Sequence, residues 1–246
     1  TRHSLMFARS PGDLQRDGLV KTDGQTGVTS ARYLTKPDGL GFLVTVATLP
    51  AGKSQGLCFT NHWETSLVLE GRGILVKQTS GTRHVLEPGV LYCVGPELHH
   101  EIKAETDLKV MGVFNPALNR DTRAGLPRLF TFSPDDLHVM GRAKRSASGN
   151  SDLLRYLLAG DSMGFTISDC RIAAGRANRL WYRNHWEANL IVDGLGSVED
   201  LASGTVTALT PGMFYCVGPD DRHVVRTETS LHLLSIFNPP LAGDEL

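Results

Sequence analysis

The chain has 246 residues and a formal net charge of −1, and it contains no long run of lysine and arginine. This charge balance argues against nucleic acid or an anionic membrane surface as its partner. No apolar stretch approaches the roughly 20 residues that a membrane-spanning helix needs. The N-terminal residues also lack the apolar segment of a signal peptide. We therefore expect a cytoplasmic protein that acts on a small molecule.

One sequence pattern occurs twice in the chain, at a constant offset of 123 residues, which is half of its length. The segment 61–64, Asn-His-Trp-Glu, recurs at 184–187, and the segment 92–96, Tyr-Cys-Val-Gly-Pro, recurs at 215–219. A register that holds without gaps over this distance indicates two copies of one domain.

The duplication predicts two domains, residues 1–123 and residues 124–246, with a connection that runs through 119–125. Domains of this size can each bury a core. Two copies in one chain can also pack as an internal pseudo-dimer that imitates a homodimer. A further homodimer of the whole chain stays open.

Each copy is predicted to begin with a short helix, because Ser10-Pro11 and Ser133-Pro134 combine a serine N-cap with a proline in the first turn. Short strands bounded by glycine turns follow. We predict strands at 42–49 and 108–114, at 165–173 and 231–237, and strand–turn–strand units at 67–76 and 190–198.

Many short strands without long helical periodicity favour an all-β fold with one small jelly-roll barrel in each copy. The segment 142–150 is rich in serine, lysine and arginine and is expected to be exposed. Cys93 and Cys216 are equivalent, and we interpret them as small buried apolar residues in a reducing compartment. A thiol near the active site and a disulfide are the alternatives.

Three polar side chains recur at matched positions in the two copies. In an extended strand, His62 and Glu64 point to one face and Trp63 to the other, and the same holds for His185 and Glu187. Each glutamate is followed by a tyrosine after a Pro-Gly turn and then by a histidine eight residues later. Carboxylate, phenolate and imidazole suit iron or zinc. Each residue alone has an ordinary structural explanation, but the matched spacing in both copies favours a metal site.

The spacing resembles the two motifs of the cupin superfamily. Glu64 and Glu187 are each followed by six residues and a glycine, as in the first motif. A Pro-Gly turn leads to Tyr92 and Tyr215, as in the second motif, where the family usually has a histidine. The histidine pair of the first motif is missing. The resemblance implies two tandem cupin barrels, a bicupin.

These departures resemble ectoine synthase, a cupin-type hydro-lyase. The second copy has that family's Asn-His-x-Glu-Ala at 184–188, Pro-Gly-x-x-Tyr at 211–215, and Phe-Asn-Pro-Pro-Leu at 237–241. In the family a Glu, a Tyr and a His hold an iron ion. The resemblance therefore implies Fe²⁺, with Zn²⁺ as the alternative. The implied ligands are Glu187, Tyr215 and His223 in the second copy, and Glu64, Tyr92 and His100 in the first.

The resemblance also implies residues for catalysis and for substrate binding. Tyr215, Tyr92 and Glu187 are the catalytic candidates. The candidates for substrate binding are Arg155, Trp181, Ser235 and Phe237 in the second copy, and Arg32 and Phe114 in the first. An arginine can bind a substrate carboxylate in bidentate fashion. An exposed arginine and a core phenylalanine fit these positions as alternatives.

The pocket wall departs from the family at two places. Ser235 and Gly112 stand where the family has a cysteine, and Ser151 and Val28 replace a tryptophan. We therefore expect an ectoine-synthase-like lyase or cyclase that dehydrates or ring-closes a different small metabolite bearing an amino or carboxylate group. The second copy is the favoured site because it keeps the aromatic segment 181–183. An iron-dependent oxygenase and a non-catalytic binding protein are the alternatives.

Overall fold

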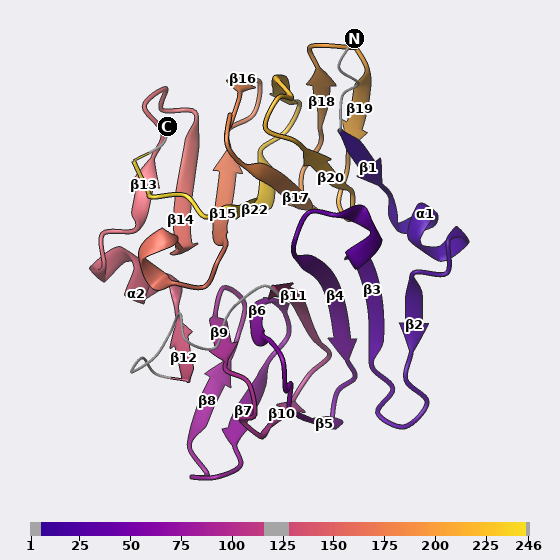
Figure 1. Ribbon diagram of the computed structural model, residues 1–246, viewed down its shortest axis with the longest axis vertical. Helices are drawn as coiled ribbons and strands as arrows, with labels where there is room; N and C mark the ends of the chain where they lie inside the picture. The colour runs from indigo at the N-terminus through magenta and orange to yellow at the C-terminus, as the bar shows by residue number, and fades with distance from the viewer. Residues whose placement is uncertain (1–5, 116–127, 245–246) are drawn as a thin grey trace. The chain divides into compact units, whose positions relative to one another are not determined.

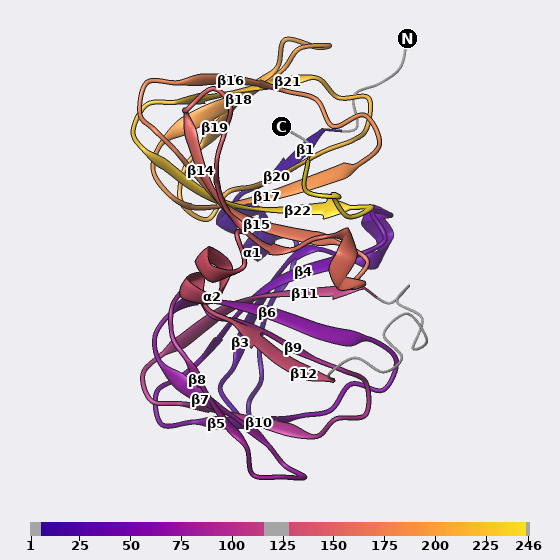
Figure 2. The same ribbon diagram turned by 90° about the vertical axis from the view of Figure 1, so that its left-hand side faces the viewer.

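The computed structural model describes residues 6–115 and 128–244, so the expected connection through 119–125 lies outside the described residues (Figures 1 and 2). Strands dominate the chain, and the expected all-β fold is confirmed. No helix in these two described ranges is long and apolar enough to cross a membrane.

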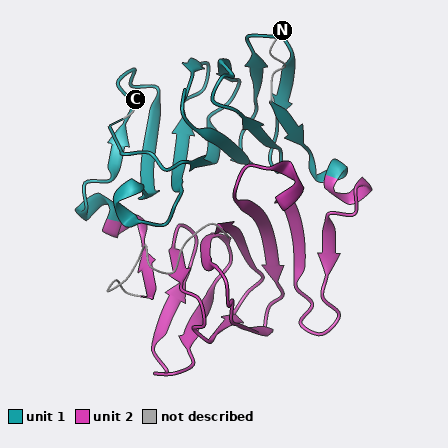
Figure 3. Cartoon of the chain, viewed as in Figure 1, with its two compact units in different colours: residues 1–13, 137–246 teal, residues 14–136 magenta. Residues whose placement is uncertain are grey.

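The chain forms two compact units whose boundaries differ from the expected division after residue 123. Unit 1 contains residues 1–13 and 137–246, and unit 2 contains residues 14–136 (Figure 3). The difference arises from strand pairing. Strand β1 (Phe7–Arg9) pairs with β20 (Phe214–Val217), and β12 (Leu129–Phe132) pairs with β9 (Leu91–Val94). The first strand of each copy thus completes a sheet of the other copy.

Unit 2 consists of two antiparallel sheets. Its other strands are β2 (Val20–Thr22), β3 (Thr29–Leu34), β4 (Leu43–Leu49), β5 (Ser54–Leu57), β6 (Trp63–Glu70), β7 (Gly73–Lys77), β8 (Arg83–Leu86), β10 (His100–Ala104) and β11 (Leu108–Asn115). The seven-stranded sheet has the order β12-β9-β6-β11-β4-β3-β2, and the four-stranded sheet has the order β5-β10-β7-β8.

Unit 1 repeats this architecture. Its other strands are β13 (Ala143–Arg145), β14 (Ser151–Leu157), β15 (Thr166–Ile172), β16 (Ala177–Leu180), β17 (Trp186–Asp193), β18 (Gly196–Asp200), β19 (Val206–Leu209), β21 (His223–Thr227) and β22 (Leu231–Asn238). The sheet orders are β1-β20-β17-β22-β15-β14-β13 and β16-β21-β18-β19. The predicted strands are all present, whereas the short strands of the smaller sheets were only partly predicted.

Each unit has an apolar core that draws on both of its sheets. Val68 of β6 and Leu75 of β7 belong to one buried cluster in unit 2, and their equivalents Ile191 and Val198 belong to one in unit 1. Burial of these apolar faces is the main stabilising contribution to such a two-sheet barrel. The expected jelly-roll arrangement is therefore present in both units.

Two glycine turns fix the expected strand–turn–strand units. Gly71 has φ +84° and Gly194 has φ +91°, a region that side chains with a Cβ rarely adopt. A Cβ at Gly71 would lie 1.9 Å from the carbonyl oxygen of Asp107, and one at Gly194 would lie 2.1 Å from that of Ser230. Only glycine fits at either turn.

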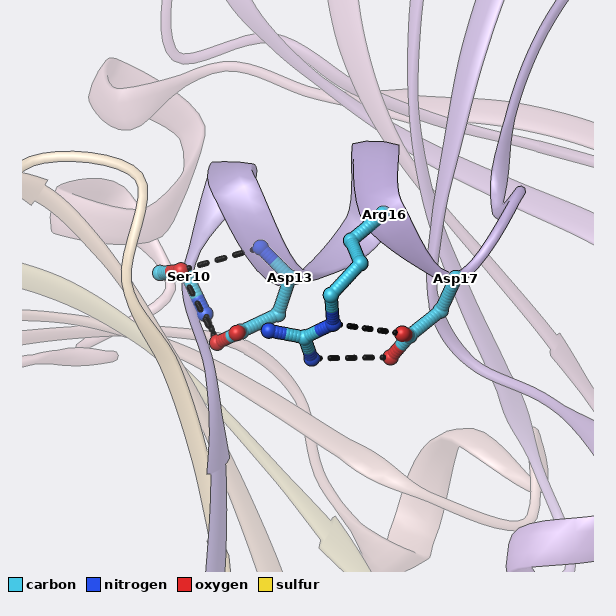
Figure 4. Close-up of polar contacts among 4 residues, drawn as sticks. All are labelled: Ser10, Asp13, Arg16 and Asp17. Carbon is cyan, nitrogen blue, oxygen red and sulfur yellow. Dashed lines mark hydrogen bonds and ion pairs between the residues drawn. The ribbon is translucent and has the colours of Figure 1, made fainter.

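The predicted helices are also present, as α1 (Pro11–Arg16) and α2 (Pro134–Val139). In α1, the amide of Asp13 donates to Oγ of Ser10 at 3.1 Å, and the amide of Ser10 donates to Oδ2 of Asp13 at 2.8 Å (Figure 4). Ser133 and Asp136 repeat this capping box in α2. The reciprocal bonds satisfy amides that a helix start otherwise leaves unpaired.

Candidate active site

In unit 1, three strands bring Glu187, Tyr215 and His223 together. They lie on β17, β20 and the first position of β21, and each side chain is almost completely buried. Nε2 of His223 lies 3.7 Å from Oε2 of Glu187, and the rings of Tyr215 and His223 are 6.4 Å apart. Neither of those two atoms has a hydrogen-bond partner, and neither has Oη of Tyr215. Three buried polar atoms without partners are rare in one place, because each is costly.

The environment of this trio disfavours charge. Burial raises the pKa of Glu187, although the charge of His223 and a hydrogen bond from Asn189 lower it in part. Burial also raises the pKa of Tyr215 well above its ordinary value, and the nearby carboxylate of Glu187 adds to this shift. A group that compensates the burial of these side chains is therefore needed for both to ionise.

A cavity of about 410 Å³ opens next to the trio in unit 1. Glu187 and Tyr215 lie in its wall, as do most of the residues that the sequence predicts for substrate binding. Those are Arg155, Ser235 and Phe237. Nη1 of the buried Arg155 donates to the carbonyl of Gly243, which holds the guanidinium in place. His223 is not in the cavity wall, but its Nε2 lies 3.7 Å from Oε2 of Glu187.

Trp181 does not fulfil the prediction that it lines the substrate pocket. The guanidinium groups of Arg183 and Arg222 lie 4.1 Å and 3.9 Å from the centroid of its ring, and its Nε1 donates to the carbonyl of Pro219 at 3.0 Å. The next residue, Tyr182, lines the cavity instead and packs on Phe237 with ring centroids 4.7 Å apart.

The sequence prediction missed several polar residues of the cavity wall. The segment 142–150, expected to be merely exposed, contributes Ser146, Ser148 and Asn150 to the wall, and Asn178 and Ser168 add further hydrogen-bonding groups. Their positions depend on long-range strand pairing, so the local sequence carried no signal for them. Asn189 could have been found, because alternation places it on the same face as Glu187.

In unit 2, the side chains of the equivalent trio contact one another more closely. Nε2 of His100 lies 2.8 Å from Oε2 of Glu64, at ion-pair distance but without the alignment of a hydrogen bond. Oη of Tyr92 donates to Oε1 of Glu64 at 3.2 Å. Burial alone would lower the pKa of His100, but the contact with Glu64 outweighs it, so the pKa is raised. The tyrosine hydroxyl that is unpaired in unit 1 thus has a partner in unit 2.

The cavity of unit 2 is also different in size and charge. It measures about 940 Å³ and is lined by Glu64 together with the predicted Arg32 and Phe114. Two lysines, Lys21 and Lys36, also line it. Tyr92 and His100 are not in its wall. Within the described ranges, neither unit groups three His, Cys, Asp or Glu side chains at a possible metal site, so each trio depends on its tyrosine.

Comparison with known proteins assigns the chain that carries these two trios to a family. The family model for ectoine synthase matches residues 14–123 and, a second time, residues 135–246. The chain belongs to the ectoine synthase family. L-ectoine synthase of Sphingopyxis alaskensis is 46% identical over 92 residues, which are 37% of this chain and 67% of the relative. L-ectoine synthase of Desulfatibacillum aliphaticivorans is 41% identical over 111 residues, 45% of this chain and 85% of the relative.

Solved structures support the two-barrel fold over the whole chain. Protein Ylba from E. coli has a TM-score of 0.71 at 14% identity, and the match covers 100% of this chain and 94% of that one. A cupin 2 conserved barrel domain protein from Leptotrichia buccalis has a TM-score of 0.59 at 11% identity, with coverage of 92% and 94%. This member of the ectoine synthase family is thus a tandem cupin and an ectoine-synthase-like lyase.

Proposed function

We propose that unit 1 carries the active centre, in which Glu187, Tyr215 and His223 hold a ferrous ion, with Zn²⁺ as the alternative. The observation that supports this proposal is the convergence of three buried polar atoms without hydrogen-bond partners. Each such atom costs roughly 1–3 kcal/mol when it is left unsatisfied. A cation between them would compensate all three at once.

The chemistry of the three side chains fits such an ion. A carboxylate, a phenolate and an imidazole are suitable ligands for ferrous iron and for zinc. Three protein ligands leave coordination positions open for a substrate. Burial raises the pKa of Glu187 and that of Tyr215, which favours their neutral forms, and a bound cation would instead favour the ionised form of both groups.

We propose that the enzyme dehydrates or ring-closes a small metabolite that bears an amino or carboxylate group. When bound, the ion supplies Lewis-acid polarisation of the substrate. Arg155 would bind a substrate carboxylate, since its buried guanidinium is fixed by the carbonyl of Gly243. Phe237 and Tyr182 form an aromatic wall that excludes water from the reacting groups. Tyr215 lies in the cavity wall and would hold or move a proton there.

We propose a substrate that differs from the one cyclised by ectoine synthase. The motif comparison puts Ser151 and Ser235 at positions where the family has a tryptophan and a cysteine, and both serines line the cavity. Other serines and asparagines of the wall also offer neutral hydrogen-bonding groups to a ligand. Rapid turnover of the acetylated diaminobutyrate precursor of ectoine would contradict this part of the proposal.

We propose that unit 2 carries neither the metal centre nor the activity, although the resemblance also implies Glu64, Tyr92 and His100 as ligands. Its tyrosine is bonded to Glu64 and does not reach the cavity wall, so the arrangement around Glu187 has no counterpart there. This interpretation agrees with the sequence analysis, in which the second copy is the favoured site.

The proposed reaction can be tested by incubating the iron-loaded protein with a panel of small amino and carboxylic acids. Loss of one water from a substrate, detected by mass spectrometry under anaerobic conditions, is the expected result. The Glu187→Gln variant should abolish this reaction. Turnover that requires and consumes dioxygen would favour an oxygenase, and binding without turnover would favour a binding protein.

A further inference from the structure

We propose that Asn189 and Ser235 are positioning residues that orient Glu187 toward the metal centre, an inference that rests on the proposed function. Asn189 lies on β17, two residues after Glu187 and on the same face of the strand. It stands directly opposite Tyr215 of β20 on one side and Ser235 of β22 on the other. The sheet therefore places it at the centre of the site.

The three side chains form a directed chain of hydrogen bonds. Oγ of Ser235 donates to Oδ1 of Asn189 at 2.6 Å, and Nδ2 of Asn189 donates to Oε1 of Glu187 at 3.0 Å. The amide orientation follows from this chain, because a carboxylate only accepts and so requires the NH₂ group. Asn189 is fully buried, and the other two side chains are nearly so.

These hydrogen bonds leave one oxygen of the Glu187 carboxylate for the metal centre. With Oε1 held by Asn189, the carboxylate is fixed in rotation, and Oε2 faces Nε2 of His223 at 3.7 Å. Hydrogen-bonded neighbours of this kind orient metal ligands, and their removal commonly costs about 10- to 100-fold in metal affinity. Asn189 and Ser235 would thus act on the ion through Glu187.

The first copy lacks this arrangement at both positions. Ser66 stands in place of Asn189, and its Oγ reaches Oε1 of Glu64 only at 3.4 Å. Gly112 stands in place of Ser235, and a Cβ there would lie 3.0 Å from Cε2 of Phe114 and 3.0 Å from Oγ1 of Thr45. The surroundings of Gly112 therefore leave little room for a serine. The two copies keep the same trio and differ in the residues that orient its glutamate.

The hydrogen bond to Asn189 also limits how the hydroxyl of Ser235 can interact with a ligand. Ser235 lines the cavity, but its single hydroxyl proton is used in the bond to Asn189. Toward a substrate it can therefore only accept a hydrogen bond. This position of the wall suits an N–H or O–H group of the substrate, which agrees with the proposed amino-bearing metabolite.

The inference can be tested by anaerobic titration of the metal-free, full-length protein with ferrous ion. Asn189→Ser, which introduces the residue of the first copy, and Ser235→Ala should each weaken binding about 10- to 100-fold. Ser235→Thr keeps the hydroxyl and should retain most of the affinity. Ser66→Ala, the matched change in the first copy, should leave the affinity unchanged. Titration without substrate separates this effect from any loss of substrate contact at Ser235.

The possible results distinguish the inference from the function on which it rests. If the parent protein binds ferrous ion and both Asn189→Ser and Ser235→Ala bind it with the same affinity, the positioning role is overturned and the metal centre stands. Absence of binding by the parent protein would reject the metal centre and the positioning role together. Circular dichroism establishes that each variant is folded, and Ser235→Ala decides alone if Asn189→Ser does not fold.

Discussion

Nε2 of His223 lies 3.7 Å from Oε2 of Glu187, whereas the equivalent atoms of His100 and Glu64 are 2.8 Å apart. The glutamate, tyrosine and histidine are the same in the two trios, so the ligand residues themselves do not explain the difference. The hydrogen-bonding partners of the two glutamates are different. In unit 1 one oxygen of Glu187 is held by Asn189, whereas in unit 2 the corresponding oxygen of Glu64 accepts from a tyrosine.

Arg155→Lys is expected to weaken substrate binding, because lysine cannot reproduce the bidentate contact of a guanidinium with a carboxylate. The loss should be about 2 kcal/mol or more, seen mainly as a higher KM for the substrate found in the screen. Arg171→Lys is the control, since Arg171 is an exposed arginine of the same unit. Equal effects of the two substitutions would argue against a carboxylate contact at Arg155.

Gly71→Ala is expected to destabilise unit 2 strongly, because the added Cβ would overlap the carbonyl oxygen of Asp107. Gly81→Ala provides the matched control. Gly81 also has a positive φ, of +69°, but has open space around it, so only the cost of about 1–2 kcal/mol for a left-handed residue applies. Urea unfolding compares the two variants. If Gly71→Ala lowers the free energy of unfolding no more than Gly81→Ala does, the close approach of Gly71 to the carbonyl oxygen of Asp107 is contradicted.

Ser133→Ala is expected to lower the free energy of unfolding by about 1 kcal/mol, because it removes the N-cap of α2. Thermal unfolding should show a midpoint roughly 2–4 °C lower. Ser10→Ala makes the same change at the equivalent cap of α1 and should have a similar effect. A change within error for both variants would indicate that the capping bonds do not stabilise the fold.

Acid should weaken the α2 cap as well. Hydrogen bonds from the amide and hydroxyl of Ser133 lower the pKa of Asp136 below its ordinary 3.8. This contribution to stability is present above pH 3.8 and is lost as the pH falls through the lower, folded-state pKa. Unfolding of the parent protein and of Asp136→Asn, compared at neutral and acidic pH, measures it. The difference in the free energy of unfolding between the parent protein and Asp136→Asn should become smaller toward acidic pH.

The thiol of Cys170 is expected to stay protonated in the folded protein at mildly alkaline pH. Burial raises its pKa to about 12, and the charge of Asp169 contributes to the shift. Alkylation followed by peptide mass spectrometry should therefore show slow modification of Cys170 near pH 9, and rapid modification after unfolding. Because the folded pKa is raised, the associated stability declines as the pH rises toward 12. Rapid alkylation of folded protein near pH 8 would contradict this.

Much of the fold could be predicted because it is encoded locally and repeated. The serine–proline pairs indicated both helices, the Gly-x-Gly turns indicated the strand pairs, and the gapless register indicated two equal units. The exchange of the first strands could not be predicted in this way. Residues 7–9 pair with β20 of the second copy, and nothing in their local sequence specifies that partner.

For the two sites, the trios could be predicted from the sequence, whereas the cavity walls could be predicted only in part. The two trios follow from the motifs, and the structure brings each of them together. The cavity walls depend on segments that are distant in the sequence, so the local sequence did not indicate that Tyr182 lines the cavity of unit 1, or that Ser146, Ser148 and Asn150 contribute to it. The local sequence also carried no signal for the hydrogen bond that the hydroxyl of Ser235 donates to Asn189.

The measurement that tests the central claim most directly is the iron content per chain after anaerobic loading, compared among the parent protein, Glu187→Gln and Glu64→Gln. We predict one equivalent in the parent protein, nearly none in Glu187→Gln, and one in Glu64→Gln. Absence of bound metal in the parent protein, or loss of the metal in Glu64→Gln with retention in Glu187→Gln, would contradict a single metal centre in unit 1.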